Sequence, residues 1–530
     1  MDFNVALLGQ GWTETDTGAV CVVRPVRPRT PADSHTRGSR FRRVHLRQFC
    51  FHSRTEMGLR VRRVDVLPAL PRGNQNFSTF FNTGSGLCES CAGIIRFSLC
   101  PTRAGENSLR ALQNCVLVCL LMTIAHLAEA SPDTWIAAWA ASPGWADPDP
   151  ILPLLNLEDQ TVRERVRLSL GGAEIRIRLS NEYGSAPLVI GAATVAAPMS
   201  PASVRAGSIH SVTFGGHDAV TIPPAAAVLS DPVAFPVIPQ AEISISLYFP
   251  QRVATPTLHG LALKRAVVSQ RGDHTRAESM EARATSKSSI SISAVLVPAQ
   301  RSQRLVVTLG DSITDGDGST VDADHNWQSD LIRRLAKTPD GSHVAVVNEG
   351  ISGNRLLNDG FSAGTGFGVG FGVSALARFD RDALALPGVT HVVLLEGVND
   401  IGFPGAKLNE RYLADPADVR TPQDLIDAYR QLISRAHARG IKMIGATIGP
   451  FEGADLPGYY SETKETTRQA VNQWIRGSGS FDGVIDFDAV LRDPDHPSRL
   501  MPRFASKDQL HPNDAGYQAM ADAIDLALFK

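Results

Sequence analysis

A chain of 530 residues is too long for one ordinary hydrophobic core, which predicts two or three domains. Its hydrophobic fraction of 43% and charged fraction of 20% are those of a soluble globular protein and exclude a largely disordered one. The formal net charge is −2, and we expect no nucleic-acid partner.

The first 130 residues differ in character from the rest. They hold 16 Arg, no Lys and 9 acidic residues, so they carry +7 and the remaining 400 residues carry −9. Residues 1–108 show no clear hydrophobic period, and we predict a basic extension of low order that is not part of the working protein. The alternative is a genuine extension that contacts nucleic acid or anionic lipid.

All seven cysteines also lie in this first segment, at Cys21, Cys50, Cys88, Cys91, Cys100, Cys115 and Cys119. The pair CESC is half of a zinc site, but no second pair of Cys or His stands at a suitable spacing, so we predict no metal there. The chain after residue 130 has no cysteine and can form no disulfide.

Residues 109–130 resemble a signal peptide. Arg103 and Arg110 precede the apolar stretch CVLVCLLMTIAHLAEA, which ends in the small residues typical of a cleavage site. The unbroken apolar part, Cys115 to Met122, is far shorter than the roughly 20 residues that span a bilayer. We therefore predict cleavage near Ala130, a secreted or periplasmic protein, and no stable membrane insertion of the mature chain; the alternative is a short buried helix.

From residue 131 to about 300 the hydrophobic period is two. RVRLSL (165–170) and AEIRIRLS (173–180) alternate apolar and polar residues around Gly171-Gly172, which predicts a hairpin with a primed turn. Similar runs follow at 241–249 and 289–297. We predict an all-β sandwich or jelly-roll-like accessory domain over 131–300.

From residue 301 onward, short apolar runs alternate with amphipathic segments. The runs are RLVVTL (304–309), HVAVVN (343–348), THVVLLE (390–396), KMIGATI (442–448) and GVIDF (483–487). Helices are predicted at WQSDLIRRL and from Pro422 to Gly440, with Thr421 as N-cap. The pattern predicts a three-layer, doubly wound parallel α/β sheet over 301–530, with its site beyond the carboxyl ends of the strands.

Two serines compete for the role of nucleophile. Ser362 lies in GFSAG, a match to the G-x-S-x-G elbow, but it has neither a strand before it nor a helix after it. Ser312 directly follows the run RLVVTL through Gly310 and Asp311. We therefore predict Ser312 as the nucleophile and a mobile loop near the site at 360–372.

The remaining groups of a serine hydrolase also follow strands or precede a helix. His511 would take the serine proton, and Asp508, three residues earlier, would fix its tautomer. Gly353 lets a backbone N–H approach a substrate, and Asn399 offers a neutral amide donor to a developing oxyanion.

In this order and spacing, GDSIT, the glycine of NEGISGNR, GVND and DQLHPND resemble the four blocks of the SGNH (GDSL-like) hydrolase superfamily. The resemblance covers 301–530 and implies a flavodoxin-like SGNH-hydrolase fold. It also implies Ser312, His511 and Asp508 as catalytic residues, with the Ser312 amide, Gly353 and Asn399 as the oxyanion hole. Two further stretches look like the branch of acetylxylan-esterase-like and arylesterase-like acylhydrolases. The Gly-rich loop after Asn358 and Ser506-Lys507 before Asp508 depart from that branch.

Other constellations are weaker. Asp315, Asp317, Asp322 and Asp324 lack the order of a calcium loop, and we predict a solvated acidic loop. A glycosidase that used carboxylates among Glu349, Glu396 and Asp400 is a second hypothesis. It would leave Ser312 and His511 without a role. The chain has no P-loop or dinucleotide fingerprint, and we predict no cofactor.

Together these patterns predict a secreted serine esterase that hydrolyses short-chain carboxylic esters, including O-acetyl groups on carbohydrate, through an acyl-enzyme on Ser312. Its partner would be a small-molecule or carbohydrate ester. The alternatives are a GDSL-type lipase or lysophospholipase, an acyltransferase with the same residues, and a glycan-binding protein with an inert hydrolase domain.

Overall fold

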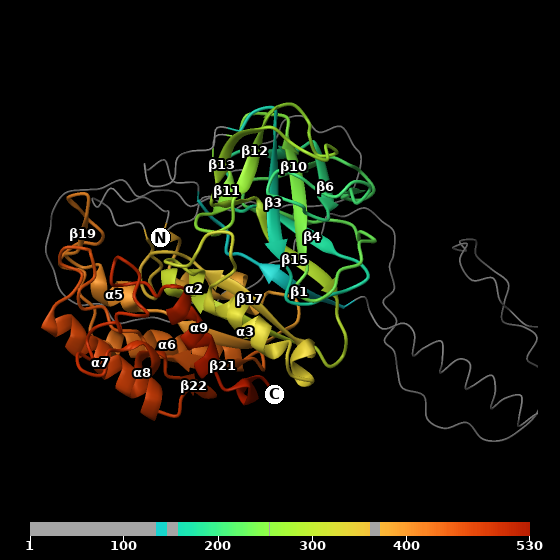
Figure 1. Cartoon of the computed structure of the whole chain (residues 1–530). Coiled ribbons are helices and arrows are strands. Elements are labelled where there is room, and N and C mark those ends of the chain that lie inside the picture. The colour runs from blue at the N-terminus through green and yellow to red at the C-terminus, as the bar shows by residue number, and fades with distance from the viewer. Residues whose placement is uncertain (1–133, 146–156, 254, 361–370) are drawn as a thin grey trace, which may run out of the picture. The chain divides into compact units, whose positions relative to one another are not determined.

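The computed structural model describes residues 134–145, 157–253, 255–360 and 371–530 (Figure 1). The predicted basic extension (1–108), the predicted signal peptide (109–130) and Ser362 lie outside these residues. Among the helices of the described ranges, none combines the length and apolar character that crossing a bilayer requires.

The five apolar runs of residues 301–530 form one parallel sheet, as predicted. They are β16 (Arg304–Gly310), β17 (Val344–Gly350), β18 (Val389–Leu395), β21 (Lys442–Ala446) and β22 (Gly483–Ile485). The strands lie in the order β17-β16-β18-β21-β22, and each neighbouring pair is parallel. This order, 2-1-3-4-5 along the chain, is that of doubly wound, flavodoxin-like sheets.

Helices cover this sheet. They are α2 (Ser312–Asp315), α3 (Trp327–Leu335), α4 (Ala375–Phe379), α5 (Val398–Gly402), α6 (Pro422–His437), α7 (Glu462–Gly477), α8 (Phe487–Leu491) and α9 (Asp514–Ala523). Single turns of other helix types lie at Asp340–His343, Asp380–Leu384 and Leu526–Phe529. Helix α6 begins as predicted, with a capping box between Thr421 and Asp424.

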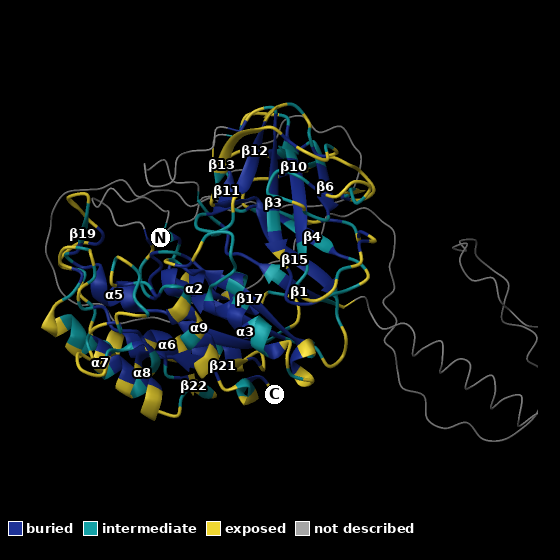
Figure 2. Cartoon of the chain, viewed as in Figure 1, coloured by how far each residue is buried: buried dark blue, intermediate teal, exposed yellow. Residues whose placement is uncertain are grey.

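Alternate residues of the strands face two separate cores. Val306 packs in one buried cluster with Trp327 of α3 and Tyr517 of α9. Its neighbour Val307 belongs to the other cluster, together with Leu425 of α6. Figure 2 shows the core side of the helices in dark blue and exposed residues on the outer sides of α7 and α8. The sheet is therefore buried on both faces, which explains its nearly continuous apolar strands.

The residues before β16 form antiparallel sheets. One sheet has the order β1 (Trp135–Ala140), β15 (Ile292–Pro298), β4 (Arg176–Asn181) and β9 (Ala226–Leu229). A second has the order β13 (Ala282–Ser286), β12 (Ala266–Arg271), β3 (Gln160–Arg167), β10 (Glu242–Phe249), β6 (Ala192–Ala196) and β7 (His210–Ser211). Smaller sheets join β14 (Ser289–Ile290), β11 (Thr257–His259) and β2 (Gly144–Trp145), and β5 (Leu188–Ile190) with β8 (Val220–Ile222). We call residues 134–299 the β-rich region; its classification as a sandwich or jelly roll and its boundary at residue 300 stay predictions.

The predicted hairpin around Gly171-Gly172 is wrong. Strand β3 pairs with β10 and β12, whereas β4 pairs with β15 and β9 in another sheet. The backbone of Gly172 instead exchanges two hydrogen bonds with Val237, at N···O distances of 2.9 and 2.8 Å. A Cβ at Gly171 would lie 2.5 Å from the Val237 carbonyl oxygen. The glycine pair therefore allows two backbones to approach and does not form a primed turn.

The β-rich region and the parallel sheet share one hydrophobic core. Ile136 of β1 lies in the same buried cluster as Leu305 of β16 and Ala345 of β17. Strand β1 contacts the edge strand β17, and the N–H of Ala137 donates to the carbonyl of Pro387 at 3.1 Å. The two parts are thus joined by apolar packing as well as by chain connectivity.

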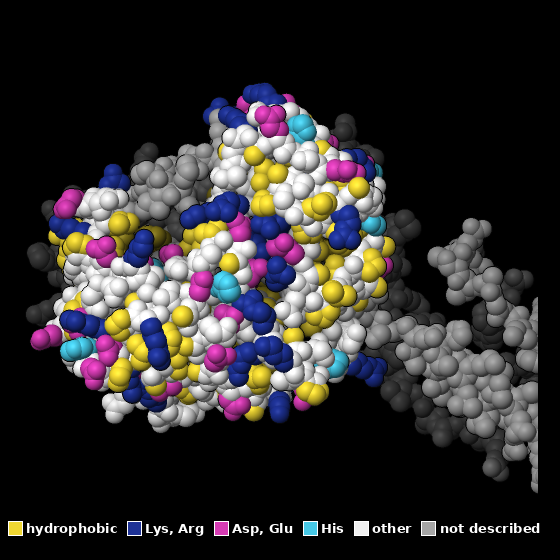
Figure 3. Space-filling view, in the orientation of Figure 1, with side chains coloured by type: hydrophobic (Ala, Val, Ile, Leu, Met, Phe, Trp, Pro, Cys, Tyr) yellow, Lys and Arg dark blue, Asp and Glu magenta, His cyan; other side chains and the backbone are white. Residues whose placement is uncertain are grey.

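The acidic loop that holds Asp322 and Asp324 is not solvated, contrary to our prediction. Asp322 pairs with Arg165 at 2.9 Å, and Asp324 pairs with Arg167 at 2.7 Å and Lys264 at 2.9 Å. The acidic side chains are only 18% and 13% exposed, and their partners all come from the β-rich region. Figure 3 shows basic and acidic side chains next to one another in the middle of this face. Within the described ranges, no three His, Cys, Asp or Glu side chains are arranged to hold a metal ion.

Candidate active site

Ser312 is the first residue of α2, at the carboxyl end of β16. The Asp311 side chain caps this helix by accepting the N–H of Ile313 at 2.9 Å. A Cβ on Gly310 would lie 2.2 Å from the Leu395 carbonyl oxygen, so only glycine fits where the strand passes into the helix. The sharp turn presents Ser312 at the edge of the sheet where open α/β folds hold their ligands.

His511 and Asp508 complete a chain of hydrogen bonds with Ser312. The Nε2 atom of His511 lies 2.8 Å from Ser312 Oγ, and its Nδ1 atom lies 2.6 Å from Asp508 Oδ2. Both residues stand in the loop before α9, whose N-cap is Asn513, as predicted. The structure therefore brings Ser312 against His511 and Asp508, which follow it almost 200 positions later in the sequence.

The Asp508 carboxylate is held by several donors. Its Oδ1 accepts the N–H groups of Leu510 and His511, each at 2.9 Å, and the hydroxyl of Ser506 at 2.6 Å. Burial acts to raise the pKa of Asp508, but the hydrogen bond and charge of His511 and the other donors hold it well below its usual range. Ser506, a departure from the related branch, thus supports the ionised carboxylate, whereas Lys507 is exposed.

The electrostatic surroundings of His511 favour its protonated form. Burial alone lowers the pKa of His511, but the hydrogen bond to Asp508 and the charges of Asp317, Asp508 and Asp311 outweigh it and raise the pKa. Asp317 was not predicted to belong to the site. Its Oδ2 lies 3.8 Å from His511 Nε2, and its side chain is 37% exposed.

Gly353 lies in a turn after β17 with a φ of +78°. A Cβ there would sit 2.2 Å from Phe371 Cδ1, so a larger residue would be strained and would also collide with the ring. Within the described part of the chain, the N–H of Gly353 has no hydrogen-bond partner. This donor is therefore available to a ligand.

Asn399 in α5 has a fixed amide orientation. The carbonyl oxygen of Asn354 can only accept a hydrogen bond, so the Asn399 atom 2.9 Å from it is Nδ2. The Asn399 Oδ1 atom accepts the hydroxyl of Tyr459 at 2.8 Å. The bond to Asn354 uses one of the two Nδ2 hydrogens and leaves the other for a further acceptor. Because Asn354 directly follows Gly353, this bond also places Asn399 beside the Gly353 turn.

The base of the Gly-rich loop lies beside the same turn. The N–H of Gly360 donates to the Gly372 carbonyl at 2.7 Å, and Asn354 Nδ2 donates to the carbonyls of Phe371 and Val373 at 2.8 and 2.9 Å. Ser362 itself lies outside the described residues. The loop thus begins and ends next to Gly353, as expected of a segment near the site.

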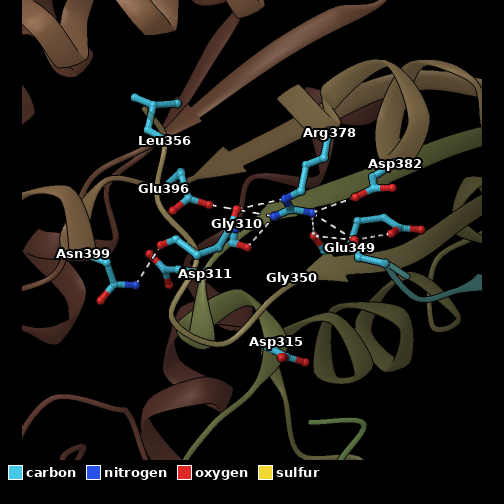
Figure 4. Close-up of polar contacts among 12 residues, drawn as sticks. Gly310, Asp311, Asp315, Glu349, Gly350, Leu356, Arg378, Asp382, Glu396 and Asn399 are labelled. Carbon is cyan, nitrogen blue, oxygen red and sulfur yellow. Dashed lines mark hydrogen bonds and ion pairs between the residues drawn. The ribbon is translucent and has the colours of Figure 1, made fainter. Parts of the chain in front are cut away.

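Arg378 of α4, which the sequence did not single out, joins the strand ends beneath the site. Its Nη2 donates to the Gly310 carbonyl at 2.9 Å, Nη1 donates to the Glu349 carbonyl at 2.7 Å, and Nε donates to Asn354 Oδ1 at 2.9 Å. Nη1 also pairs with Asp382 at 3.2 Å. The side chain is fully buried, and Figure 4 shows it pointing toward Gly310 between Glu349 and Glu396.

The three carboxyl groups considered as glycosidase residues are buried and have structural contacts. Burial raises the pKa of Glu349 and Glu396, and the Glu349 carboxyl accepts the hydroxyl of Ser142 at 2.5 Å. Burial also raises the pKa of Asp400 to about 6, although the N–H groups of Leu356 and Leu357 donate to it at 2.6 and 3.0 Å. This Asp400 contact fixes the chain just after the Gly353 turn.

Residues 308–519 match the sequence model of the GDSL-like lipase/acylhydrolase family, so this part of the chain is a GDSL-like lipase/acylhydrolase domain. The resemblance indicated by the four motifs is thereby confirmed. No curated protein matches the chain.

Several solved structures are similar to part of the chain. A GDSL-like lipase from Bacteroides thetaiotaomicron VPI-5482 is 21% identical, over 44% of this chain and 90% of its own, with a TM-score of 0.30. A variant of an acetyl xylan esterase from Geobacillus stearothermophilus is 20% identical, over 41% and 91%, with a TM-score of 0.30. The aryl esterase of M. Smegmatis is 15% identical, over 42% and 95%, with a TM-score of 0.31.

We predict that Arg378→Met lowers the free energy of unfolding by about 3–5 kcal/mol, because it removes a buried charge and leaves buried carbonyls without a donor. Urea denaturation followed by tryptophan fluorescence measures the change. Arg271→Met is the matched control, since Arg271 is 68% exposed and its pair with Glu158 at 3.5 Å should contribute less than about 1 kcal/mol. Equal losses in the two variants would contradict the role given to Arg378.

We also predict that Asp317→Asn lowers the pKa of His511, since the Asp317 charge favours the imidazolium. The titration midpoint of the His511 ring, followed by NMR with labelled histidine, should move to lower pH. Asp340 is exposed and lies just before the amino end of β17, whereas His511 lies against Ser312 at the carboxyl end of β16, so Asp340→Asn should leave the midpoint unchanged. An unchanged or higher midpoint in the Asp317 variant would show that this carboxylate does not act on His511.

Proposed function

We propose that the GDSL-like lipase/acylhydrolase domain of this chain is a serine carboxylic ester hydrolase, with Ser312 as its nucleophile. The observation that carries the proposal is the continuous hydrogen-bond chain from Ser312 through His511 to Asp508, at 2.8 and 2.6 Å. A serine hydroxyl is a weak nucleophile, and this arrangement of base and orienting carboxylate is the one that activates it.

In acylation, Ser312 Oγ bonds to the ester carbonyl carbon while its proton moves to His511 Nε2. The imidazolium is stabilised by the ionised Asp508, which also holds the proton on Nδ1. As the tetrahedral intermediate collapses, the ester C–O bond breaks and Nε2 returns the proton to the leaving alcohol oxygen. His511 Nε2 then takes a proton from water as the water oxygen attacks the acyl-enzyme carbonyl carbon. The bond between this carbon and Ser312 Oγ breaks, and Nε2 returns the proton to Oγ, which releases the carboxylic acid and restores Ser312.

The negative charge that develops on the carbonyl oxygen needs donors fixed in advance. We assign this role to the N–H groups of Ser312 and Gly353 and to Asn399 Nδ2. The support is that Gly353 N–H is free within the described ranges and that Tyr459 and Asn354 hold the Asn399 amide in one orientation.

We further propose a short acyl group on the substrate. Aromatic rings pack beside the proposed oxyanion donors. The Phe371 ring lies where a Cβ on Gly353 would be, and its centroid is 5.5 Å from that of Phe403. The centroids of Phe403 and Tyr459 are 6.0 Å apart. Phe403 and Tyr459 are buried in the main core cluster. This packing supports a preference for acetyl or butyryl esters, including those of carbohydrates.

The alternatives differ in substrate and acceptor. A lipase or lysophospholipase and an acyltransferase would use the same residues, whereas a glycan-binding protein would not need them. Export through the predicted signal peptide and action outside the cytoplasm belong to the proposal, and its substrate would be a soluble or carbohydrate ester.

We predict that Ser312→Ala abolishes hydrolysis of p-nitrophenyl acetate by the chain from Ser131, while Ser362→Ala keeps it. Asn399→Ala should lower kcat by about 100-fold to 1000-fold, the usual effect of losing one oxyanion donor. Steady-state kinetics with p-nitrophenyl acetate and acetylated sugars measures both. Activity that survives in the Ser312 variant and disappears in the Ser362 variant would refute the assignment.

The acyl preference is tested with p-nitrophenyl esters of increasing chain length. We expect kcat/KM to be highest for acetyl and butyryl esters and to fall for chains of eight carbons or more. Equal or faster hydrolysis of long-chain esters would exclude the short-acyl proposal and favour the lipase alternative. Product analysis with added alcohol separates transfer from hydrolysis.

A further inference from the structure

His259 lies at the end of β11 in the β-rich region and is only 7% exposed. Its Nδ1 lies 3.1 Å from the carbonyl oxygen of Ser142, and its Nε2 lies 3.0 Å from Asp315 Oδ1. Asp315 is the last residue of α2, the helix that begins at Ser312. A side chain of the β-rich region therefore contacts the helix that carries the proposed nucleophile.

The Ser142 carbonyl beside His259 Nδ1 determines how many protons His259 and Asp315 share. The Ser142 carbonyl can only accept, so Nδ1 carries a hydrogen. The bond between Nε2 and Asp315 then holds one proton, as an imidazolium with a carboxylate or as a neutral imidazole with a carboxylic acid. In either form, a hydrogen bond joins His259 to Oδ1.

The surroundings of the pair keep that proton in place. Burial lowers the pKa of His259, but the charge and hydrogen bond of Asp315, the Ser142 carbonyl and the charge of Glu349 outweigh it and raise the pKa. Glu164 of β3 also acts on His259 and is itself buried. Burial raises the pKa of Asp315.

The second oxygen of Asp315 reaches the turn that holds Gly353. Asp315 Oδ2 accepts the N–H of Ser352 at 3.0 Å. Ser352 directly precedes Gly353, and its N–H is thereby bonded to the last residue of α2. One carboxyl group thus ties the Ser312 helix to the turn that supplies the proposed oxyanion donor.

We propose that His259 is a positioning residue for catalysis, which holds Asp315 so that this carboxyl fixes the Gly353 turn against α2. The inference rests on the proposed function, since it assigns Gly353 to the oxyanion hole. It makes the β-rich region part of the catalytic apparatus of the hydrolase domain.

Stability alone does not explain the pair. A buried ionisable pair loses hydration on folding, and apolar residues of similar volume are often as stable or more so. An apolar residue at 259 would leave Asp315 Oδ1 buried without a donor and free the carboxyl to rotate away from Ser352. A donor placed at the Nε2 position is what the geometry requires.

Two substitutions separate the contacts of His259. In His259→Gln, the amide nitrogen reaches the Nε2 position and still donates to Asp315, whereas the bond to Ser142 is lost. In His259→Asn, the shorter amide reaches only the Nδ1 position, so the bond to Ser142 is kept and that to Asp315 is lost. The test measures kcat and KM for p-nitrophenyl acetate with the full chain, together with the thermal unfolding of each variant.

We expect His259→Asn to lower kcat by about 10-fold to 100-fold with KM within about threefold, because small misplacements of reacting groups have effects of this size. His259→Gln should keep kcat within about threefold of the parent. Equal kcat in the two variants, whether retained or lost, would overturn the inference, since it would show that the Asp315 contact is not what matters.

A second pair of variants keeps the test valid if His259→Asn does not fold. Asp315→Asn can still accept the Ser352 N–H and donate to a neutral His259, so its kcat should exceed that of Asp315→Leu by at least about 10-fold. Equal kcat in this pair would also overturn the inference. Activity of the parent that does not depend on Ser312 would instead refute the proposed function, so the two failures are distinguishable.

Discussion

The candidate site depends on the burial of one guanidinium. Strands β16 and β17 end beneath the site. The carbonyls of Gly310, the last residue of β16, and Glu349, the residue before the last of β17, are buried, where an unpaired carbonyl is costly. Arg378 donates to both and to Asn354, from a single planar group with five N–H donors. A lysine has three donors on one atom and cannot reach partners spread in this way.

The position of Arg378 links three features of the candidate site. Gly310 sets the direction in which the chain enters α2 and presents Ser312. Asn354 accepts from Asn399 through its carbonyl, and its amide donates to the carbonyls of Phe371 and Val373 at the carboxyl-terminal end of the Gly-rich loop. A displacement of the guanidinium would therefore affect Ser312, Asn399 and one end of the Gly-rich loop together.

Much of the hydrolase domain could be predicted from the sequence. A parallel strand buried on both faces needs an unbroken apolar run, and the five runs found in the sequence are the five strands of the sheet. Functional groups of such folds follow the strands, so position, together with the family resemblance, predicts Ser312, Gly353 and Asn399 as site residues. His511 and Asp508 precede a helix whose N-cap was also recognisable, and the structure places them against Ser312.

The errors and omissions have a common physical origin, which is contact between residues far apart in sequence. Asp322 pairs with Arg165, 157 positions away, and a run of acidic residues without visible partners is indistinguishable from a solvated loop. The Gly171-Gly172 pair satisfies the local pattern of a hairpin, but its backbone pairs with Val237. Arg378 and His259 belong to no sequence motif, because their contribution depends only on the carbonyl and carboxyl groups that surround them in the folded chain.

These long-range contacts decide how the β-rich region relates to catalysis. Ile136 packs in the core cluster of the parallel sheet, and Ser142 and His259 bond with Glu349 and Asp315 in buried surroundings. Separating the two parts would expose apolar surface and leave these polar groups unpaired, at about 1–3 kcal/mol for each one that stays buried. A module that only bound glycan would have no need of such bonds, whereas a support for the Ser312 helix would. We therefore infer that the β-rich region and the hydrolase domain fold as one unit.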